Sequence, residues 1–180
     1  RVNGAGQDIN RAMSDDSVIE SVTLRRLLRG RRFDLFFDLH EDYEATGFYM
    51  YEAQQQDQLL GHRVVEAVKQ IGTIDGDENT DAGLDTPISE GLFGINPKWR
   101  DQGWSAYGYF EAAEHGILPE TPSMAWPLAQ RVQAHHTTLR VVLDHYNKES
   151  ASRRLRQSKR FASTSSRICC GCRCRPMRGS

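Results

Sequence analysis

The sequence lacks any apolar run of the roughly 18 to 20 residues that a membrane-spanning helix needs, which excludes a helical membrane protein. It also lacks a positively charged and then apolar leader, and its first residue is Arg1 rather than Met, so no secretory signal can be read from it. What it does contain, 38% hydrophobic residues with 9% aromatic in 180 residues, is enough for one ordinary buried core. We therefore expect one domain, as a piece of a longer protein.

Acidic residues are missing from one part of the chain. From Ala151 to the end there are nine Lys or Arg and no Asp or Glu, whereas residues 1–150 hold 14 basic and 24 acidic side chains, a net charge of −10. The acidic body argues against nucleic acid as a main partner. The tail is rich in Ser, Arg and Cys without apolar periodicity, so burial cannot offset the entropy of ordering it. We predict a domain over 1–148 and a basic, cysteine-containing, disordered tail over 149–180.

Three segments have the apolar spacing of helices. The first begins at Ser17, which together with Glu20 has the pattern of a capping box, and it stops at Gly30. The second lies within residues 57–71. The third is a long helix over 128–146 with one stripe that we expect to be buried, made of Leu128, Val132, His135, Leu139, Val142 and Tyr146.

Short apolar runs between these helices predict strands. Residues 33–39 are aromatic-rich and mostly apolar, as in a strand buried between helices, and residues 116–118 form another such run. Residues 48–51 fit either a neighbouring strand or the wall of a pocket. We expect loops over 72–100 and over the Gly- and aromatic-rich segment 103–109. The order of elements predicts an α/β fold class, a partial three-layer α/β/α arrangement with a mostly parallel or mixed central sheet.

His40 is the first candidate for chemistry, because it directly follows the strand predicted over 33–39. Open α/β sheets place ligand and catalytic groups at the carboxyl ends of their strands. An imidazole there could coordinate a cation through one nitrogen while a carboxylate or carbonyl holds its other N–H. The simpler alternative is a histidine that is hydrogen-bonded to neighbouring acids.

Glu120 is the second candidate, since it stands between Pro119 and Pro122 at the end of a short apolar segment. Partial burial raises the pKa of a carboxyl group toward the range that is useful for a general base. The alternative is a carboxylate that helps to cap the helix after Pro122.

The third candidate is the segment that runs from Arg1 to Arg11 and contains Asn10. A guanidinium beside an amide can hold a substrate carboxylate through charge-assisted, bidentate hydrogen bonds. By itself the segment equally fits a turn followed by a surface ion pair.

Taken in order, these segments resemble the zinc carboxypeptidase family, the carboxypeptidase A-like metallopeptidases. Members carry an Arg, then an Asp-x-Asn-Arg block, later a strand that ends in His, and finally a Glu before the last helix. Here the matching segments are Asp8-Ile9-Asn10-Arg11, Asp38-Leu39-His40 and Glu120-Thr121-Pro122. The resemblance covers residues 1 to about 146.

The resemblance implies a role for each position. His40 is similar to the family's third zinc ligand, Glu120 to its catalytic base, and Arg1 to the arginine that polarises the scissile carbonyl. Asn10 and Arg11 would hold the terminal carboxylate of a peptide or N-acyl amino acid substrate. Zinc is the implied cofactor, and metal-assisted hydrolysis of a C-terminal peptide or amide bond is the implied reaction.

The family's first two zinc ligands come from a His-x-x-Glu segment, and no histidine of this sequence begins one. Asp8 would accept a hydrogen bond from a zinc-bound histidine of that segment. Because catalytic zinc normally has three protein ligands and one open position, the chain alone is expected to bind zinc poorly and to be nearly inactive.

Three alternatives remain open. One is a deacylase or amidase of the same fold that acts on N-acyl amino acids or cell-wall peptides, and another is a non-catalytic fragment. The last is a metal or nucleic-acid binding role for the tail through Cys169, Cys170, Cys172 and Cys174. Four cysteines within six residues do not have the two separated pairs of a structural zinc site, which argues against that role.

Overall fold

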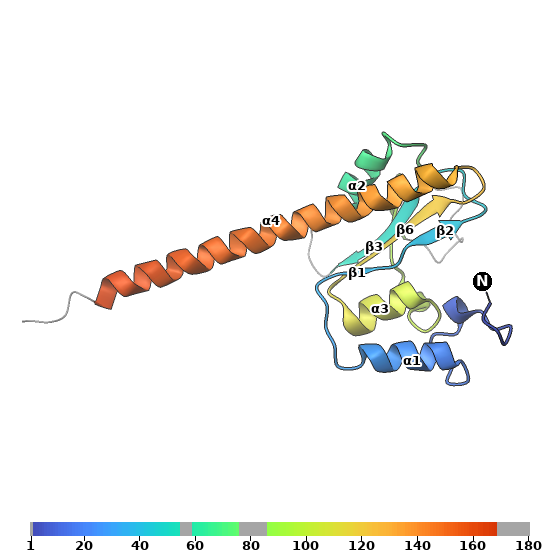
Figure 1. Cartoon of the computed structure of the whole chain (residues 1–180), viewed down its shortest axis with the longest axis horizontal. Helices are drawn as coiled ribbons and strands as arrows, with labels where there is room; N and C mark the ends of the chain where they lie inside the picture. Colours follow the sequence, from blue (N-terminus) through green and yellow to red (C-terminus); the bar gives the residue numbers. More distant parts are fainter. Residues whose placement is uncertain (1, 55–58, 76–85, 169–180) are drawn as a thin grey trace, which may run out of the picture. The chain divides into compact units, whose positions relative to one another are not determined.

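The computed structural model describes residues 2–54, 59–75 and 86–168 (Figure 1). They form two compact units, Arg1–Val141 and Val142–Ser180. The elements are, in order, η1 (Ile9–Arg11), α1 (Ile19–Leu28), β1 (Phe36–Phe37), β2 (His40–Asp42), β3 (Tyr49–Gln54), α2 (Gly61–Val68), β4 (Thr86–Ser89), β5 (Leu92–Gly94), η3 (Pro97–Trp99), α3 (Trp104–Ala112), β6 (His115–Pro122) and α4 (Leu128–Ile168). None of the helices in the described part combines the length and the apolar composition of a membrane-spanning segment.

The sheet of the first unit is mixed, which confirms the predicted fold class. Its strand order is β1-β6-β3-β5-β4, and β2 also pairs with β6. Strands β1 and β2 run parallel to β6, and β3 runs parallel to β5, whereas the pairs β3–β6 and β4–β5 are antiparallel. Strand β6 therefore has partners on both sides.

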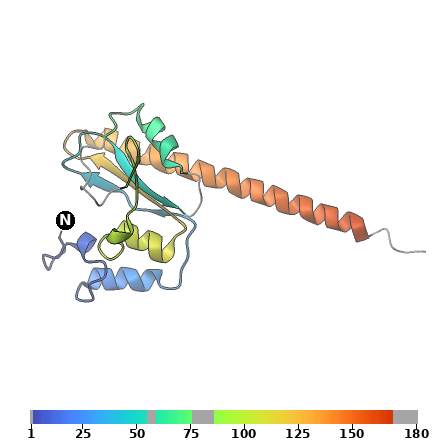
Figure 2. The same ribbon diagram turned by 180° about the vertical axis from the view of Figure 1, so that it is seen from behind.

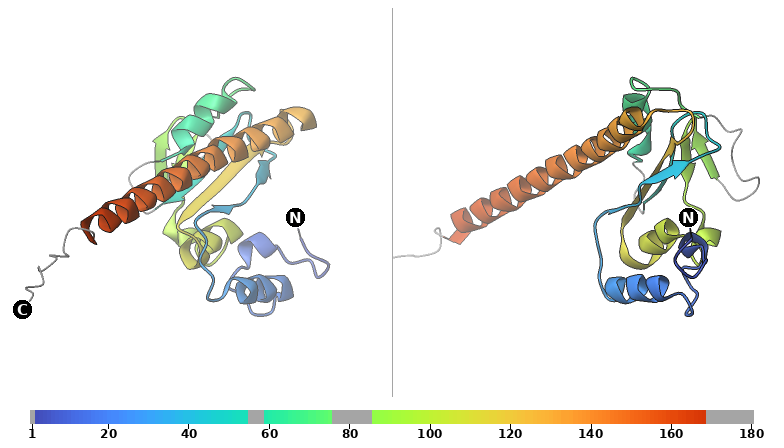
Figure 3. Two further views of the ribbon diagram at one scale, coloured as in Figure 1. Left: turned by 60° about the vertical axis from the view of Figure 1, so that its left-hand side comes forward. Right: turned by 45° about the vertical axis from the view of Figure 1, so that its right-hand side comes forward.

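Helices cover the sheet of the first unit on both faces. Helix α2 and the first turns of α4 lie on one side, and α1 and α3 lie together on the other (Figures 1 and 2). The views in Figure 3 show the same pairing of α1 with α3. Side chains that the structure buries completely, or almost so, form the core, and the largest of them are Phe48, Met13, Met50, Leu92 and Ile117.

The first helix forms where the sequence predicts it, but without the predicted capping box. Helix α1 begins at Ile19 after Val18, and no side chain caps it. The Glu20 carboxylate instead accepts a hydrogen bond from Asn3 Nδ2 at 3.0 Å. The predicted stop is correct, because Gly30 has φ +70° just beyond the helix.

The strand predicted over 33–39 is shorter in the structure, where only β1 falls within this range and β2 begins just after it at His40. Phe36 and Phe37 are half-buried rather than buried, because within the described residues β1 lies at the edge of the sheet and pairs with β6 alone. Most of the segment at 48–51 lies in a strand, since β3 begins at Tyr49.

The loop expected over 72–100 contains a strand pair that the sequence reading missed. Strands β4 and β5 are joined through Gly91, which has φ +69°. Pro87 is compatible with β4, because β4 is the last strand of the sheet order and proline is tolerated in an edge strand. Residues 76–85 lie outside the described part.

The segment expected as a loop over 103–109 is the start of α3. A Cβ atom added to Gly108 would lie 2.5 Å from the Phe36 ring, so the glycine allows this helix to approach β1 closely. The aromatic residues that suggested a loop are packing partners here, since Phe36 and Trp104 form an edge-to-face pair at 5.3 Å between ring centroids.

The final helix buries the predicted stripe only in part, because Val142 is fully buried while His135, Leu139 and Tyr146 are half-buried. Leu128 and Val132 are 64% and 57% exposed, while Ala134, Thr137 and Thr138 are buried. Thr138 satisfies its hydroxyl by donating to the Ala134 carbonyl at 3.0 Å. Hydrophobicity alone does not identify such a face.

The predicted boundary at 148/149 falls inside α4, which continues to Ile168. The disorder of the tail over 149–180 stays a prediction. Residues 169–180, with all four cysteines, lie outside the described part.

Gly61 begins α2 where side chains leave no room. A Cβ atom there would lie 2.3 Å from Leu92 Cδ1 and 2.7 Å from Glu52 Oε2, and both of these side chains are fully buried. We expect Gly61→Ala to lower the free energy of unfolding by about 1 to 3 kcal/mol, measured by urea denaturation. Gly103→Ala is the control, because its added Cβ would meet its nearest atom at 3.7 Å. Equal stability of the two variants would contradict this account.

Candidate functional site

Three strands bring the side chains of the site together. In the parallel pair, His40 of β2 is in register with Glu120 of β6, and in the antiparallel pair Tyr49 of β3 is in register with the same glutamate. Residues directly opposite on neighbouring strands project from the same face of a sheet. The alternative role of Glu120 as a helix-capping carboxylate is therefore wrong, because it lies inside β6 and faces the histidine.

The imidazole of His40 contacts two carboxylates. Its Nε2 lies 3.0 Å from Asp38 Oδ2, and its Nδ1 lies 3.3 Å from Glu120 Oε1. Ser105, in the first turn of α3, donates a short hydrogen bond to the same oxygen of Asp38. The histidine is thus fixed from one side by a serine–aspartate pair and meets the glutamate on the other.

Burial and charge shift the titration of these groups. Burial opposes the charged form of His40, but its hydrogen bonds with Asp38 and Glu120 outweigh that effect and raise the pKa of His40 to about 10. Burial raises the pKa of Glu120, although the neighbouring histidine opposes the change. Burial and then the charge of Glu120 also raise the pKa of Tyr49, whose hydroxyl donates to Asp42 Oδ2 at 2.8 Å.

One oxygen of Glu120 is available for chemistry. Glu120 is only 9% exposed, and its Oε2 is buried without a hydrogen-bond partner among the described residues. Buried polar atoms nearly always have a hydrogen-bond partner, so an unpaired carboxylate oxygen such as Oε2 indicates a group that interacts with a ligand or substrate.

The arrangement around His40 fits one position of a metal site. Metal-binding histidines usually donate one ring N–H to a carboxylate and offer the other nitrogen to the metal, and Asp38 already holds Nε2. The coordination set is not complete, since the described residues contain no group of three or more His, Cys, Asp or Glu side chains that could hold an ion. His40 can therefore serve as a ligand only alongside others.

The Asn10 segment reaches this site through α3 rather than directly. Asn10 Oδ1 accepts from the backbone N–H of Trp104 at 3.1 Å, one residue before Ser105. Arg11 is exposed, and its guanidinium lies 5.2 Å from the centroid of the Trp99 ring. Asp8 accepts from the backbone N–H of Asn10 at 3.0 Å and so caps η1.

Two groups of the site escaped the sequence reading. Asp38 lies two residues before His40, and an acid at that spacing could have been recognised from the sequence as the partner of the histidine. Ser105 carried no local signal, because its contact with Asp38 joins positions 67 residues apart. Arg1 lies outside the described residues.

Comparisons with solved structures relate this fold to metallopeptidases. A putative metallopeptidase from Shewanella amazonensis matches with a TM-score of 0.63 and 22% identity over 81% of this chain and 57% of its own. A putative metallopeptidase from Shewanella denitrificans matches with a TM-score of 0.65 and 20% identity over 81% and 55%. A metallo-carboxypeptidase from Burkholderia cenocepacia matches with a TM-score of 0.54 and 18% identity over 82% and 40%.

The chain therefore shares its fold with these proteins. It spans little more than half the length of the two Shewanella proteins. No protein-family model and no curated protein matches the sequence.

Proposed function

We propose that this chain carries part of the active site of a zinc-dependent, carboxypeptidase-like hydrolase. The observation that supports the proposal is the position of His40, held at Nε2 by Asp38 while Nδ1 lies beside the carboxylate of Glu120. The fold shared with the metallopeptidase structures and the resemblance to zinc carboxypeptidases agree with it. The remaining ligands are proposed to come from outside the described residues.

Each residue has a distinct role in this proposal. His40 is one ligand of the zinc, and Asp38 sets the orientation of its ring. A zinc ion supplies a Lewis acid that polarises the scissile carbonyl and lowers the pKa of water. Glu120, with its free Oε2, takes the proton from the attacking water and delivers it to the leaving nitrogen as the C–N bond breaks.

The substrate is proposed to carry a free carboxylate. Arg11 is exposed and supplies a planar guanidinium that can bind it in bidentate fashion, with Asn10 beside it. Arg1 is proposed to offset negative charge on the carbonyl oxygen in the transition state.

The test is a hydrolysis assay of the longest natural form of the protein on short peptides, their C-terminal amides and N-acyl amino acids. We expect turnover of substrates with a free carboxylate and loss of that turnover with a chelator. Arg11→Ala should lower kcat/KM for them by about 10- to 100-fold, mainly through KM, because it removes charge-assisted hydrogen bonds. Arg140→Ala, an exposed arginine on α4, is the control. Preference for N-acyl amino acids would identify a deacylase, and equal turnover of the amides would contradict the role of Arg11.

A further inference from the structure

The surface of α1 and the segment after it concentrates positive charge that the proposed hydrolase does not use. Five arginines fall within eight residues, at Arg25, Arg26, Arg29, Arg31 and Arg32. The first 150 residues as a whole carry ten more acidic than basic side chains. A local excess of this kind on an acidic domain creates a surface of opposite sign that attracts anions.

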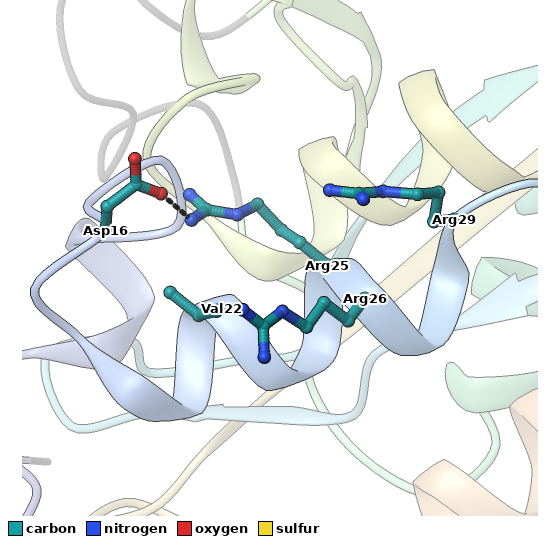
Figure 4. A pocket seen from close by; sticks show the side chains of 5 residues that line it. All are labelled: Asp16, Val22, Arg25, Arg26 and Arg29. Carbon is teal, nitrogen blue, oxygen red and sulfur yellow. Dashed lines mark hydrogen bonds and ion pairs between the residues drawn. The ribbon is translucent and has the colours of Figure 1, made fainter.

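Three of these arginines surround a hollow. Arg25, Arg26 and Arg29 line a cavity of about 290 Å³ together with Asp16 and Val22 (Figure 4). Figure 4 shows that the three arginine side chains all run back along the helix toward its N-terminal end. Of the three, the Arg25 guanidinium meets a partner among the side chains drawn, Asp16, whereas those of Arg26 and Arg29 are exposed.

The Arg25 side chain, which lines this cavity, is held in place by its contacts. It pairs with Asp16, its Nη1 donates to the Met13 carbonyl at 2.8 Å, and its side chain is only 17% exposed. The single acid that lines the cavity is thus already matched by one arginine. No acidic side chain that lines the cavity is left to offset the charges of Arg26 and Arg29.

Arg26 and Arg29 are exposed and have no ion-pair partner within the part of the chain that the structure describes. They stand three residues apart, and Arg25 and Arg29 four apart, which are spacings at which like charges destabilise a helix. Basic residues near a helix C-terminus do offset the helix dipole, but that effect accounts for one or two of them and does not require a shared hollow. The arrangement is explained if a bound anion offsets the repulsion.

We propose that this cavity binds a phosphoryl group, carried either by a free polyphosphate or by a phosphoinositide headgroup. Guanidinium groups match phosphate oxygens with two parallel hydrogen bonds, and several of them around a small hollow suit a compact anion of high charge. The inference does not depend on the hydrolase proposal.

The first arm of the test is calorimetric titration of the complete chain with sodium pyrophosphate at fixed ionic strength without divalent metal. We expect Arg26→Gln/Arg29→Gln to bind at least about tenfold more weakly than the parent, since each lost charge-assisted hydrogen bond contributes enough for that change. Arg26→Lys/Arg29→Lys should lose part of the affinity, because it keeps the charge and removes the planar groups.

The matched control is Arg63→Gln/Arg140→Gln, which removes the same charge from two exposed arginines on α2 and α4. It should bind like the parent, with circular dichroism showing that all variants are folded. If Arg26→Gln/Arg29→Gln and Arg63→Gln/Arg140→Gln weaken binding equally, only the net charge of the protein matters and the proposal is wrong. If Arg26→Gln/Arg29→Gln binds like the parent, other basic segments bind the anion and the proposal is also wrong.

The second arm distinguishes the two sources. Phosphatidylcholine vesicles that contain phosphatidylinositol 4,5-bisphosphate are compared with vesicles of equal charge that contain phosphatidylserine. Sedimentation with the first alone, lost in Arg26→Gln/Arg29→Gln, would identify a lipid headgroup, whereas pyrophosphate binding without sedimentation would identify a free polyphosphate. Failure of both probes to bind would overturn the proposal.

Discussion

Glu120→Gln is expected to abolish most hydrolysis while leaving zinc binding intact. The amide has nearly the shape of the carboxylate but cannot accept a proton at neutral pH, so only the proton transfer is lost. General base catalysis contributes about 10²- to 10⁴-fold, and we expect a fall in kcat of that size with little change in KM. The measurement is steady-state kinetics on the best substrate of the panel, with zinc content determined on the same preparation.

Two variants make this result specific. Glu114→Gln changes an exposed carboxylate just before β6 and should leave kcat unchanged. His40→Ala should lower both turnover and zinc content, because it removes a ligand instead of the base. Full turnover in Glu120→Gln would eliminate Glu120 as the base, and loss of zinc from that variant would make it a ligand.

Glu52→Ala is expected to destabilise the fold by about 3 to 5 kcal/mol, because each buried hydrogen-bond donor left without its acceptor costs about 1 to 3 kcal/mol. Glu52 is 1% exposed and His115 is 3% exposed, and His115 Nε2 lies 2.7 Å from Glu52 Oε1. The same carboxylate accepts from the backbone N–H groups of Leu60 at 2.8 Å and Gly61 at 2.6 Å, at the start of α2. Removal of the carboxylate leaves three buried hydrogen-bond donors without their acceptor.

Urea denaturation followed by circular dichroism measures this loss. Glu66→Ala is the control on the exposed face of α2, where only a pair with Lys69 is lost, and it should change stability by at most about 0.5 kcal/mol. Glu52→Gln keeps the shape and one acceptor oxygen, so it should fall between the parent and Glu52→Ala. A loss below about 1 kcal/mol for Glu52→Ala would mean that the buried pair does not hold α2 in place.

The elements that the sequence predicted well have local signals. The apolar run before His40 predicted a strand that ends at this residue, the run before Glu120 predicted a strand that leads to it, and the helical spacing within 57–71 identified α2. Strand periodicity is a property of a few consecutive residues, so no knowledge of the rest of the fold was required.

The features that the sequence did not predict depend on distant partners. The close approach of Gly108 to Phe36 decides that residues 103–109 begin a helix against the sheet, and that contact is invisible in the segment itself. Similarly, Ala134 and Thr138 are buried by the fit of α4, although Leu128 and Val132 are more hydrophobic. Tertiary packing overrides intrinsic hydrophobicity in such cases.

The double pairing of β6 has a consequence for how this fold can diverge. Glu120 is aligned with His40 on one neighbouring strand and with Tyr49 on the other. The site therefore needs a glutamate, and it also needs the number of residues in β6 that keeps this glutamate in register with both. A one-residue insertion or deletion in a strand turns every following side chain to the opposite face. Lineages that keep this chemistry can therefore exchange most side chains along β6 but must conserve its length, and length changes should accumulate in the connecting loops instead.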